Sequence, residues 1–207
     1  MRSGDHERYA LSFTSGTLLL REAQVAVPLY LQLRDWKKVR RVIEDDNLLQ
    51  ARTSTSSARL ARETVQRLAV LKDAELVTFD ELSPSERGYL MWVAACRRYV
   101  FIGDFAEDVV RERFLLLTPG LSHKEFDRFV SSKSLWRPEL TELKDSTLKK
   151  LRANVFRMLT EADLLSDGQI QQAVLSDRAL GLFNAQDPSD IRFLPARVPM
   201  EVTNELS

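Results

Sequence analysis

The segment STLKKLRANVFRMLTEADLLSDGQI, residues 146–170, decides how the rest of the chain is interpreted. Its first part predicts an amphipathic helix from about Ser146 to Ala162, capped by Asp145 or Ser146. The apolar face of this helix is formed by Leu148, Leu151, Val155, Met158 and Leu159. After the helix, apolar residues flank the dipeptide Asp167-Gly168, which favours a tight antiparallel hairpin. The segment therefore predicts a helix followed by a small wing.

Helical spacing of apolar residues also dominates the rest of the chain, and glycine and proline are scarce at seven each. The sequence therefore predicts a predominantly all-α fold with a few short strands. In the first half of the chain, helices are expected from Ser15 to Leu33 with a kink or break at Pro28, from a cap at Asp35 to near Asn47, and from a cap at Ser57 to about Leu71. In the second half, further helices are expected from Glu86 to Tyr99, from Asp104 to Leu116, and from Ser122 to Val130. Glu75–Phe79 is expected as a short strand, and the tail containing Pro188, Pro195 and Pro199 as irregular.

The stretch Asp80-Glu81-Leu82-Ser83-Pro84-Ser85 is typical of a linker that ends in a helix cap. A chain of 207 residues is long enough for one large domain or two small ones. We expect two small helical bundles: residues 1–80 with a helix-turn-helix-like unit, and residues 81–207 with a winged-helix-like unit. Gly120 is the next candidate for the boundary.

Charge is balanced over the whole chain, with 30 Lys and Arg against 30 Asp and Glu. Because no net charge attracts the molecule to a polyanion, any nucleic-acid contact must come from local clusters. No stretch approaches the roughly 18 apolar residues that a membrane span needs, and the polar opening residues do not resemble an export signal. The sequence therefore predicts a cytoplasmic protein with no membrane partner.

Basic residues gather in three segments, 34–41, 52–67 and 144–157. A weak internal repeat appears when Ser56-Ser57-Ala58-Arg59 is laid on Ser146-Thr147-Leu148-Lys149 at a shift of 90 residues. Both copies combine a hydroxyl cap, a cationic first turn, an apolar stripe and a later apolar pair, Leu76-Val77 or Leu164-Leu165, where a wing would begin. This pattern is typical of recognition helices, which meet DNA through their N-terminal ends.

The predicted DNA-binding residues share a place near the start of these helices or in the first basic segment. They are Lys37, Lys38, Arg40, Arg41, Ser57, Arg59, Arg62, Thr147, Lys149, Lys150 and Arg152. The other interpretation of each basic ridge is that it is only the solvated side of an amphipathic helix.

Residues suited to catalysis are few. Cys96 lies in apolar surroundings and is expected to be a buried thiol, while His6 and His123 have no neighbouring metal-ligating or catalytic partners and are expected at the surface. No glycine-rich phosphate loop occurs, and Glu44-Asp45-Asp46 is interpreted as a solvated helix end. The sequence predicts no enzymatic activity, no cofactor and no metal.

The order and spacing of several segments resemble the BrxA family. These segments are Tyr9 to Gly16 with Leu18 to Glu22, Asp35-Trp36 to Leu49, Ser56 to Leu68, Cys96-Arg97-Arg98-Tyr99 with Asp104-Phe105, and Ser146 to Arg152. The resemblance implies a role in BREX defence, in which a host island methylates its own DNA and blocks phage replication. It also implies double-stranded DNA binding by a non-enzymatic helical protein, but it identifies no contact residues.

The resulting hypothesis is a non-enzymatic BREX component that binds double-stranded DNA mainly through phosphates. The alternative is a protein–protein adaptor that docks other BREX proteins and contacts DNA only incidentally. A nuclease would require a metal-dependent activity that is lost on replacing Glu44, Asp45 or Asp46, and none is expected.

Overall fold

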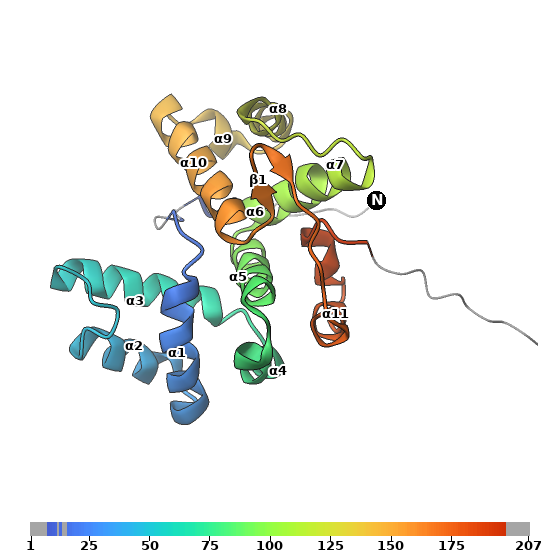
Figure 1. Ribbon diagram of the computed structural model, residues 1–207. Coiled ribbons are helices and arrows are strands. Elements are labelled where there is room, and N and C mark those ends of the chain that lie inside the picture. Colours follow the sequence, from blue (N-terminus) through green and yellow to red (C-terminus); the bar gives the residue numbers. More distant parts are fainter. Residues whose placement is uncertain (1–7, 12, 14–15, 198–207) are drawn as a thin grey trace, which may run out of the picture.

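The computed structural model describes residues 8–11, 13 and 16–197, which form a predominantly helical fold with one short hairpin (Figure 1). The longer helices are α1 (Leu20–Leu33), α2 (Trp36–Asp45), α3 (Ser54–Leu68), α5 (Pro84–Arg98), α8 (His123–Ser134), α10 (Asp145–Glu161) and α11 (Asp177–Asn184). The shorter elements are α4 (Asp73–Thr78), η1 (Phe79–Glu81), α6 (Val100–Phe105), the π-helical turn η2 (Ala106–Arg111), α7 (Glu112–Leu115), α9 (Pro138–Thr141) and η3 (Asp190–Phe193). The hairpin pairs β1 (Leu165–Ser166) with β2 (Gln169–Ile170). The predicted all-α class is confirmed.

The helices α1, α2 and α3 pack against one another at one end of the molecule, at the lower left of Figure 1. Asp35 caps α2 as predicted, because its carboxylate accepts hydrogen bonds from the backbone N–H groups of Lys37 and Lys38 at 2.8 and 3.3 Å. Pro28 lies inside a continuous α1, so the expected break does not occur. Pro28 and Gln24, one turn earlier, are both exposed, so water can solvate the carbonyl that the proline leaves without an amide partner. The expected start of this helix at Ser15 is wrong, because residues 16–19 are not helical and α1 begins at Leu20; Ser15 itself lies outside the described residues.

Two local predictions after α2 are wrong. The cap of α3 is Thr53 rather than Ser57, since the Thr53 hydroxyl accepts from the backbone N–H of Ser56 at 3.1 Å. The segment expected as a strand is the helix α4 followed by η1. Helical geometry places Leu76 and Phe79, three residues apart, on one side, where both are buried.

The second half of the chain also contains more regular structure than predicted. The helix expected from Asp104 begins at Val100 and continues through η2 into α7. The tail, expected to be irregular, contains α11 and η3. It is attached to the core where the Trp92 indole N–H donates to the Phe193 carbonyl at 2.9 Å.

The helix α5 lies at the centre of the molecule (Figure 1) and packs against α1, α3, α6, α10 and η3. Its side chains are buried from Gly88 to Cys96. One continuous cluster of buried apolar residues reaches from Tyr9 to Ala196 and includes residues of both predicted units. The division into residues 1–80 and 81–207 stays a prediction, and α5 directly follows its boundary.

The elements α8, α9, α10 and the hairpin form the opposite end of the molecule, at the top of Figure 1. The helix predicted to start at Ser122 begins one residue later, and Ser122 caps it, with its Oγ accepting from the N–H of Lys124 at 3.2 Å. The predicted hairpin is confirmed, with Leu165 opposite Ile170. The chain just before α8 joins the hairpin edge, because the Leu121 N–H donates to the Gly168 carbonyl at 2.8 Å. These contacts fix the hairpin beside the start of α8.

Candidate nucleic-acid interface

The helix α10 separates an apolar side from a basic side. Its buried residues are Leu151, Val155, Met158 and Leu159. Lys149, Lys150 and Arg157 are exposed, and Thr147 is half-buried. The predicted cap at Asp145 or Ser146 is wrong, because α10 begins at Asp145 and Lys144 holds the cap position without a side-chain hydrogen bond. In the first turn, the Asp145 carboxylate lies where the helix dipole favours negative charge.

Arg152 belongs to the packing between two helices. Its side chain is half-buried, and its Nη1 donates to both carboxylate oxygens of Asp127 on α8 at 2.7 and 3.0 Å. The charge of this predicted DNA contact is therefore neutralised by a neighbouring carboxylate.

The hairpin of α2 and α3 presents a second basic surface. Lys37, Lys38 and Arg41 are exposed on α2, and Arg59 and Arg62 are exposed on α3. Because residues on one helical face recur every three or four positions, Lys37 and Arg41 form one cationic stripe, and Arg59 and Arg62 form another. Two basic ridges therefore exist on this hairpin.

Two of the predicted contacts on this hairpin are engaged or enclosed. The Nε of Arg40 pairs with Glu44 one turn later at 2.5 Å, so this arginine is partly neutralised within its own helix. Ser57 is buried, with 4% of its surface exposed. Its hydroxyl therefore faces the interior and does not reach the surface of α3.

The structure leaves seven of the predicted basic residues outside any ion pair within the described part of the chain. They are Lys37, Lys38, Arg41, Arg59, Arg62, Lys149 and Lys150.

The helices α3 and α10 meet near their C-terminal ends, where Arg67 lies 3.8 Å from the Met158 sulfur. Figure 1 shows that the two helices diverge toward their N-terminal ends. The basic residues therefore form two separate surfaces, one on the α2–α3 hairpin and one on α10.

The internal repeat pairs two arginines whose environments are opposite. Arg157 is exposed beside Lys149 and Lys150, and it was absent from the predicted contacts although it lies in the third basic segment. Arg67 is fully buried, where its guanidinium donates to the Thr17 carbonyl at 2.8 Å and to Glu63 at 3.4 Å. Burial lowers the pKa of Arg67, while Glu63 opposes that effect. A repeated position therefore does not imply a repeated role.

Residues near the N-terminus support the turn before α10, a feature that the sequence analysis missed. The Tyr9 N–H donates to Glu139 on α9 at 2.8 Å, and Arg8 pairs with Glu142 just after α9 at 3.2 Å. The Arg137 guanidinium lies 4.2 Å from the centre of the Tyr9 ring. Burial and a hydrogen bond to Asp104 raise the pKa of Tyr9. The α9 region is therefore held in place by a segment more than 100 residues away in the chain.

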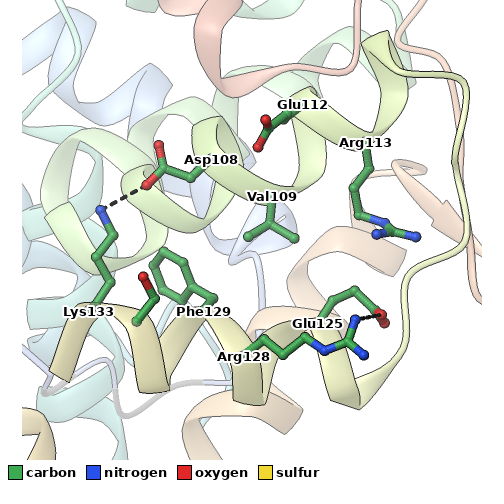
Figure 2. Close-up of a pocket in the computed structure, with 9 residues that line it drawn as sticks. Asp108, Val109, Glu112, Arg113, Glu125, Arg128, Phe129 and Lys133 are labelled. Atoms are coloured by element: carbon green, nitrogen blue, oxygen red, sulfur yellow. Dashed lines mark ion pairs between the residues drawn. The ribbon is translucent and has the colours of Figure 1, made fainter. Parts of the chain in front are cut away.

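A pocket of about 320 Å³ lies between α8 and the segment from η2 to α7 (Figure 2). Its charged side chains pair with one another: Lys133 with Asp108 at 2.8 Å, and Arg128 with Glu125 at 3.6 Å. Figure 2 shows Glu112 at one edge and Arg113 at another. Because acidic and basic groups alternate around it, the pocket does not offer the uniformly positive lining that suits phosphates.

The residues that were considered for catalysis or metal binding lie apart from one another. Cys96 is buried, as predicted, and burial raises its pKa. His123 is exposed at the start of α8 with its ring 5.1 Å from that of Phe156, and His6 lies outside the described residues. Glu44 ends α2 with Asp45, and Asp46 caps it. Within residues 8–11, 13 and 16–197 no group of three His, Cys, Asp or Glu side chains could hold a metal ion, and no helix there is long and apolar enough to cross a membrane.

Comparisons with known proteins identify the family. The BREX protein BrxA of Escherichia coli O9:H4 (strain HS) is 31% identical over 150 residues, which cover 71% of this chain and 69% of the relative. The BREX protein BrxA of Paramagnetospirillum magneticum (strain ATCC 700264 / AMB-1) is 26% identical over 162 residues, which cover 78% of this chain and 81% of the relative. A crystal structure of an uncharacterised protein from Magnetospirillum magneticum has the same fold, with a TM-score of 0.74 and 22% identity over 91% of this chain and 98% of that one. Since the BrxA family model also matches residues 7–187, the chain belongs to the BrxA family.

Proposed function

We propose that this chain is a component of a BREX phage-defence system that binds double-stranded DNA without catalysing a reaction. The curated relatives are both named as BREX proteins, which supports the first part of the proposal. The second part rests on the shape and charge of the region around α10.

The order of elements at this end matches that of a winged helix-turn-helix module. Only residues 142–144 separate α9 from α10, which is the short connection typical of two helices crossing at a steep angle. The β1–β2 hairpin follows α10 at the position of a wing. In such modules the second helix enters the major groove while the first crosses the phosphate backbone. We therefore assign α10 as the recognition helix.

One observation carries this assignment: the exposed side of α10 presents three basic residues and is not neutralised. Lys149 and Lys150 are consecutive, Arg157 lies about two turns later, and none of them takes part in an ion pair with another described residue. Lysine and arginine side chains on an exposed helix attract the phosphates that flank the groove.

The α2–α3 hairpin serves as an accessory surface in this proposal. Eight residues, 46–53, separate its two helices, and the helix α4 rather than a β-hairpin follows α3. This geometry lacks both the short turn and the wing. Its exposed residues Lys37, Arg59 and Arg62 are therefore expected to contact phosphates rather than to place a helix in the groove.

The experiment compares DNA binding of the wild-type chain with that of Lys149→Glu/Lys150→Glu/Arg157→Glu. Titrations with a duplex about two helical turns long, at several salt concentrations between about 50 and 200 mM, give the affinity and its salt slope. The triple variant is expected to lose on the order of 100-fold in affinity and to have a shallower slope. All three side chains are exposed, so the variant should fold normally.

The control carries two charge reversals, one fewer than the α10 variant, outside both basic surfaces: Arg21→Glu and Lys72→Glu. Both side chains are exposed and lie on or next to other helices. The control should lose only a few-fold in affinity, through its change in net charge. Equal losses in the control and in the α10 variant would contradict a specific role of α10.

A second candidate function, a protein–protein adaptor, is favoured by an exposed apolar cluster at the end of α7. Leu115, Leu116 and Leu117 are each more than half exposed, and contiguous exposed apolar residues commonly mark protein interfaces. Leu116→Glu/Leu117→Glu tests this role in cells that carry the complete defence island. Loss of phage resistance with unchanged DNA affinity supports the adaptor, whereas unchanged resistance opposes it.

A further inference from the structure

The largest exposed aromatic side chain of the described region stands at the entrance to α9. Trp136 has 74% of its surface exposed, and its neighbour Leu135 has 76% exposed. The chain's other tryptophans differ: Trp92 is fully buried, and Trp36 stacks on Tyr30 with ring centres 4.0 Å apart. Exposing an indole to water is unfavourable. The Trp136 side chain should therefore either stabilise the local structure or contact a ligand.

A structural explanation does not account for the Trp136 side chain. Backbone contacts already fix this turn, where the Trp136 N–H donates to the Lys133 carbonyl at 3.0 Å and the Leu140 N–H donates to the Arg137 carbonyl at 3.0 Å. The next residue, Arg137, lies over the Tyr9 ring and is thereby directed toward the protein. The indole, in contrast, remains largely in solvent.

The position of Trp136 relative to α10 indicates which surface it can meet. The helix α9 spans only four residues, a rise of about 6 Å, and three residues later α10 begins. Trp136 therefore stands at the entrance to the short helix that leads, through one three-residue turn, into α10. When a recognition helix occupies the major groove, the preceding helix crosses the sugar–phosphate backbone.

The charges around this turn fit a polyanion better than an apolar partner protein. Lys144 immediately precedes α10, Lys149 and Lys150 follow one turn later, and all three side chains are exposed. Of the carboxylates here, Glu142 is paired with Arg8, and Asp145 is exposed in the first turn of α10. Three exposed lysines therefore outnumber the one carboxylate outside an ion pair on this side, which favours a polyanionic ligand.

We propose that Trp136 packs its indole against the deoxyribose face of the DNA backbone when α10 occupies the major groove. This inference rests on the proposed function and adds an apolar contact to a surface otherwise built from charges. An indole against the sugars contributes binding energy without neutralising a phosphate. Its contribution is therefore expected to be independent of salt, unlike that of Lys149 or Lys150.

The test measures the affinity and the salt slope of Trp136→Ala with the same duplex as above. The affinity should fall about fivefold to tenfold at every salt concentration because buried apolar area is lost, and the slope should remain that of the wild type. Leu116→Ala is the matched control, since it truncates another exposed apolar side chain, 65% exposed, at the end of α7. It should leave the affinity unchanged.

Tryptophan emission provides a second measurement in a Trp36→Phe background. Trp92 is enclosed by the core, so a change on adding duplex reports Trp136. The emission should shift or be quenched as the duplex binds, and Trp136→Phe in the same background should remove that response.

The outcomes separate the inference from the function on which it rests. If the α10 triple variant loses binding while Trp136→Ala binds normally and the emission stays constant, the indole contact is wrong and DNA binding by α10 stands. If neither variant changes the affinity, the function itself is wrong. A loss in Trp136→Ala accompanied by a changed salt slope would also overturn the apolar contact, because it would indicate displaced charges.

Discussion

The helices α3 and α10 have similar sequence patterns and different surroundings. Each has exposed basic residues on one side and a buried apolar stripe on the other. However, α10 follows a three-residue turn and leads into a hairpin, whereas α3 follows an eight-residue connection and leads into α4. The difference shows that an amphipathic basic helix becomes a candidate recognition helix through the elements beside it.

Arg67 and Arg157, equivalent in the internal repeat, give the largest expected contrast between the two helices. Arg67→Met should lower the free energy of unfolding by about 3–5 kcal/mol, because it removes a charged partner of the buried Glu63 carboxylate and the hydrogen bond to the Thr17 carbonyl. Arg157→Met, on the exposed side of α10, should change it by less than about 0.5 kcal/mol. Urea unfolding followed by circular dichroism measures both. Equal stability of the two variants would remove the distinction between the repeat copies.

The central helix α5, which both regions contact, gives the next largest expected effect on the free energy of unfolding. The Glu86 carboxylate accepts from the backbone N–H groups of Ser83 and Ser176 at 2.9 and 2.8 Å. Burial opposes ionisation of Glu86, but these hydrogen bonds prevail and lower its pKa from 4.5 to about 2. The stabilisation should therefore be complete above pH 4.5 and be lost as the pH falls from 4.5 toward 2.

Glu86→Gln isolates this carboxylate from the other acidic groups. The difference in unfolding free energy between the wild type and this variant should amount to about 2–3 kcal/mol near neutral pH and should shrink below pH 4.5. Urea unfolding across this range measures the difference. A difference that stays constant with pH would show that the ionised form of Glu86 has no special role.

The caps of α3 and α8 offer a smaller, matched comparison between the two regions. Ser122 forms a reciprocal capping box with Glu125, whose side chain accepts from the Ser122 N–H at 2.8 Å. Thr53 makes a single cap hydrogen bond. Ser122→Ala should cost about 1–1.5 kcal/mol and Thr53→Ala about 0.5–1 kcal/mol, as measured by thermal unfolding. The reverse order would indicate that α3 depends more strongly on its cap.

The smallest expected effect is a gain of DNA binding. Asp127→Asn removes the carboxylate that neutralises Arg152 and leaves that guanidinium beside the basic side of α10. The affinity for duplex should rise about twofold to threefold, with a slightly steeper salt slope. Fluorescence anisotropy resolves a change of this size. A loss of affinity would instead show that the ion pair is needed to orient α10.

The sequence predicted features that depend on neighbouring residues and missed those that depend on distant ones. The cap at Asp35, the position of the α8 start to within one residue and the turn at Asp167-Gly168 were predicted correctly, because a few adjacent residues determine each of them. The burial of Arg67 depends on Thr17 and Met158, far away in the chain, so the basic segment that contains Arg67 gave no indication of it.

The same limit explains the errors at the candidate site. Arg152 looked available until α8 brought Asp127 beside it. Ser57 fitted the cap pattern, but Thr53 competes for that role four residues earlier and leaves Ser57 inside the helix. Lys149 and Lys150 were correctly expected on the exposed side of α10, since local amphipathicity alone determines that side.

The most direct test of α10 as the principal DNA-binding element compares the salt dependence of three proteins. They are the wild type, the α10 variant Lys149→Glu/Lys150→Glu/Arg157→Glu, and the α3 variant Arg59→Glu/Arg62→Glu. A plot of log affinity against log salt should lose up to about 0.9 in slope for each phosphate contact removed, and the loss should be largest for the α10 variant. An α10 variant with the slope and affinity of the wild type would contradict the proposal.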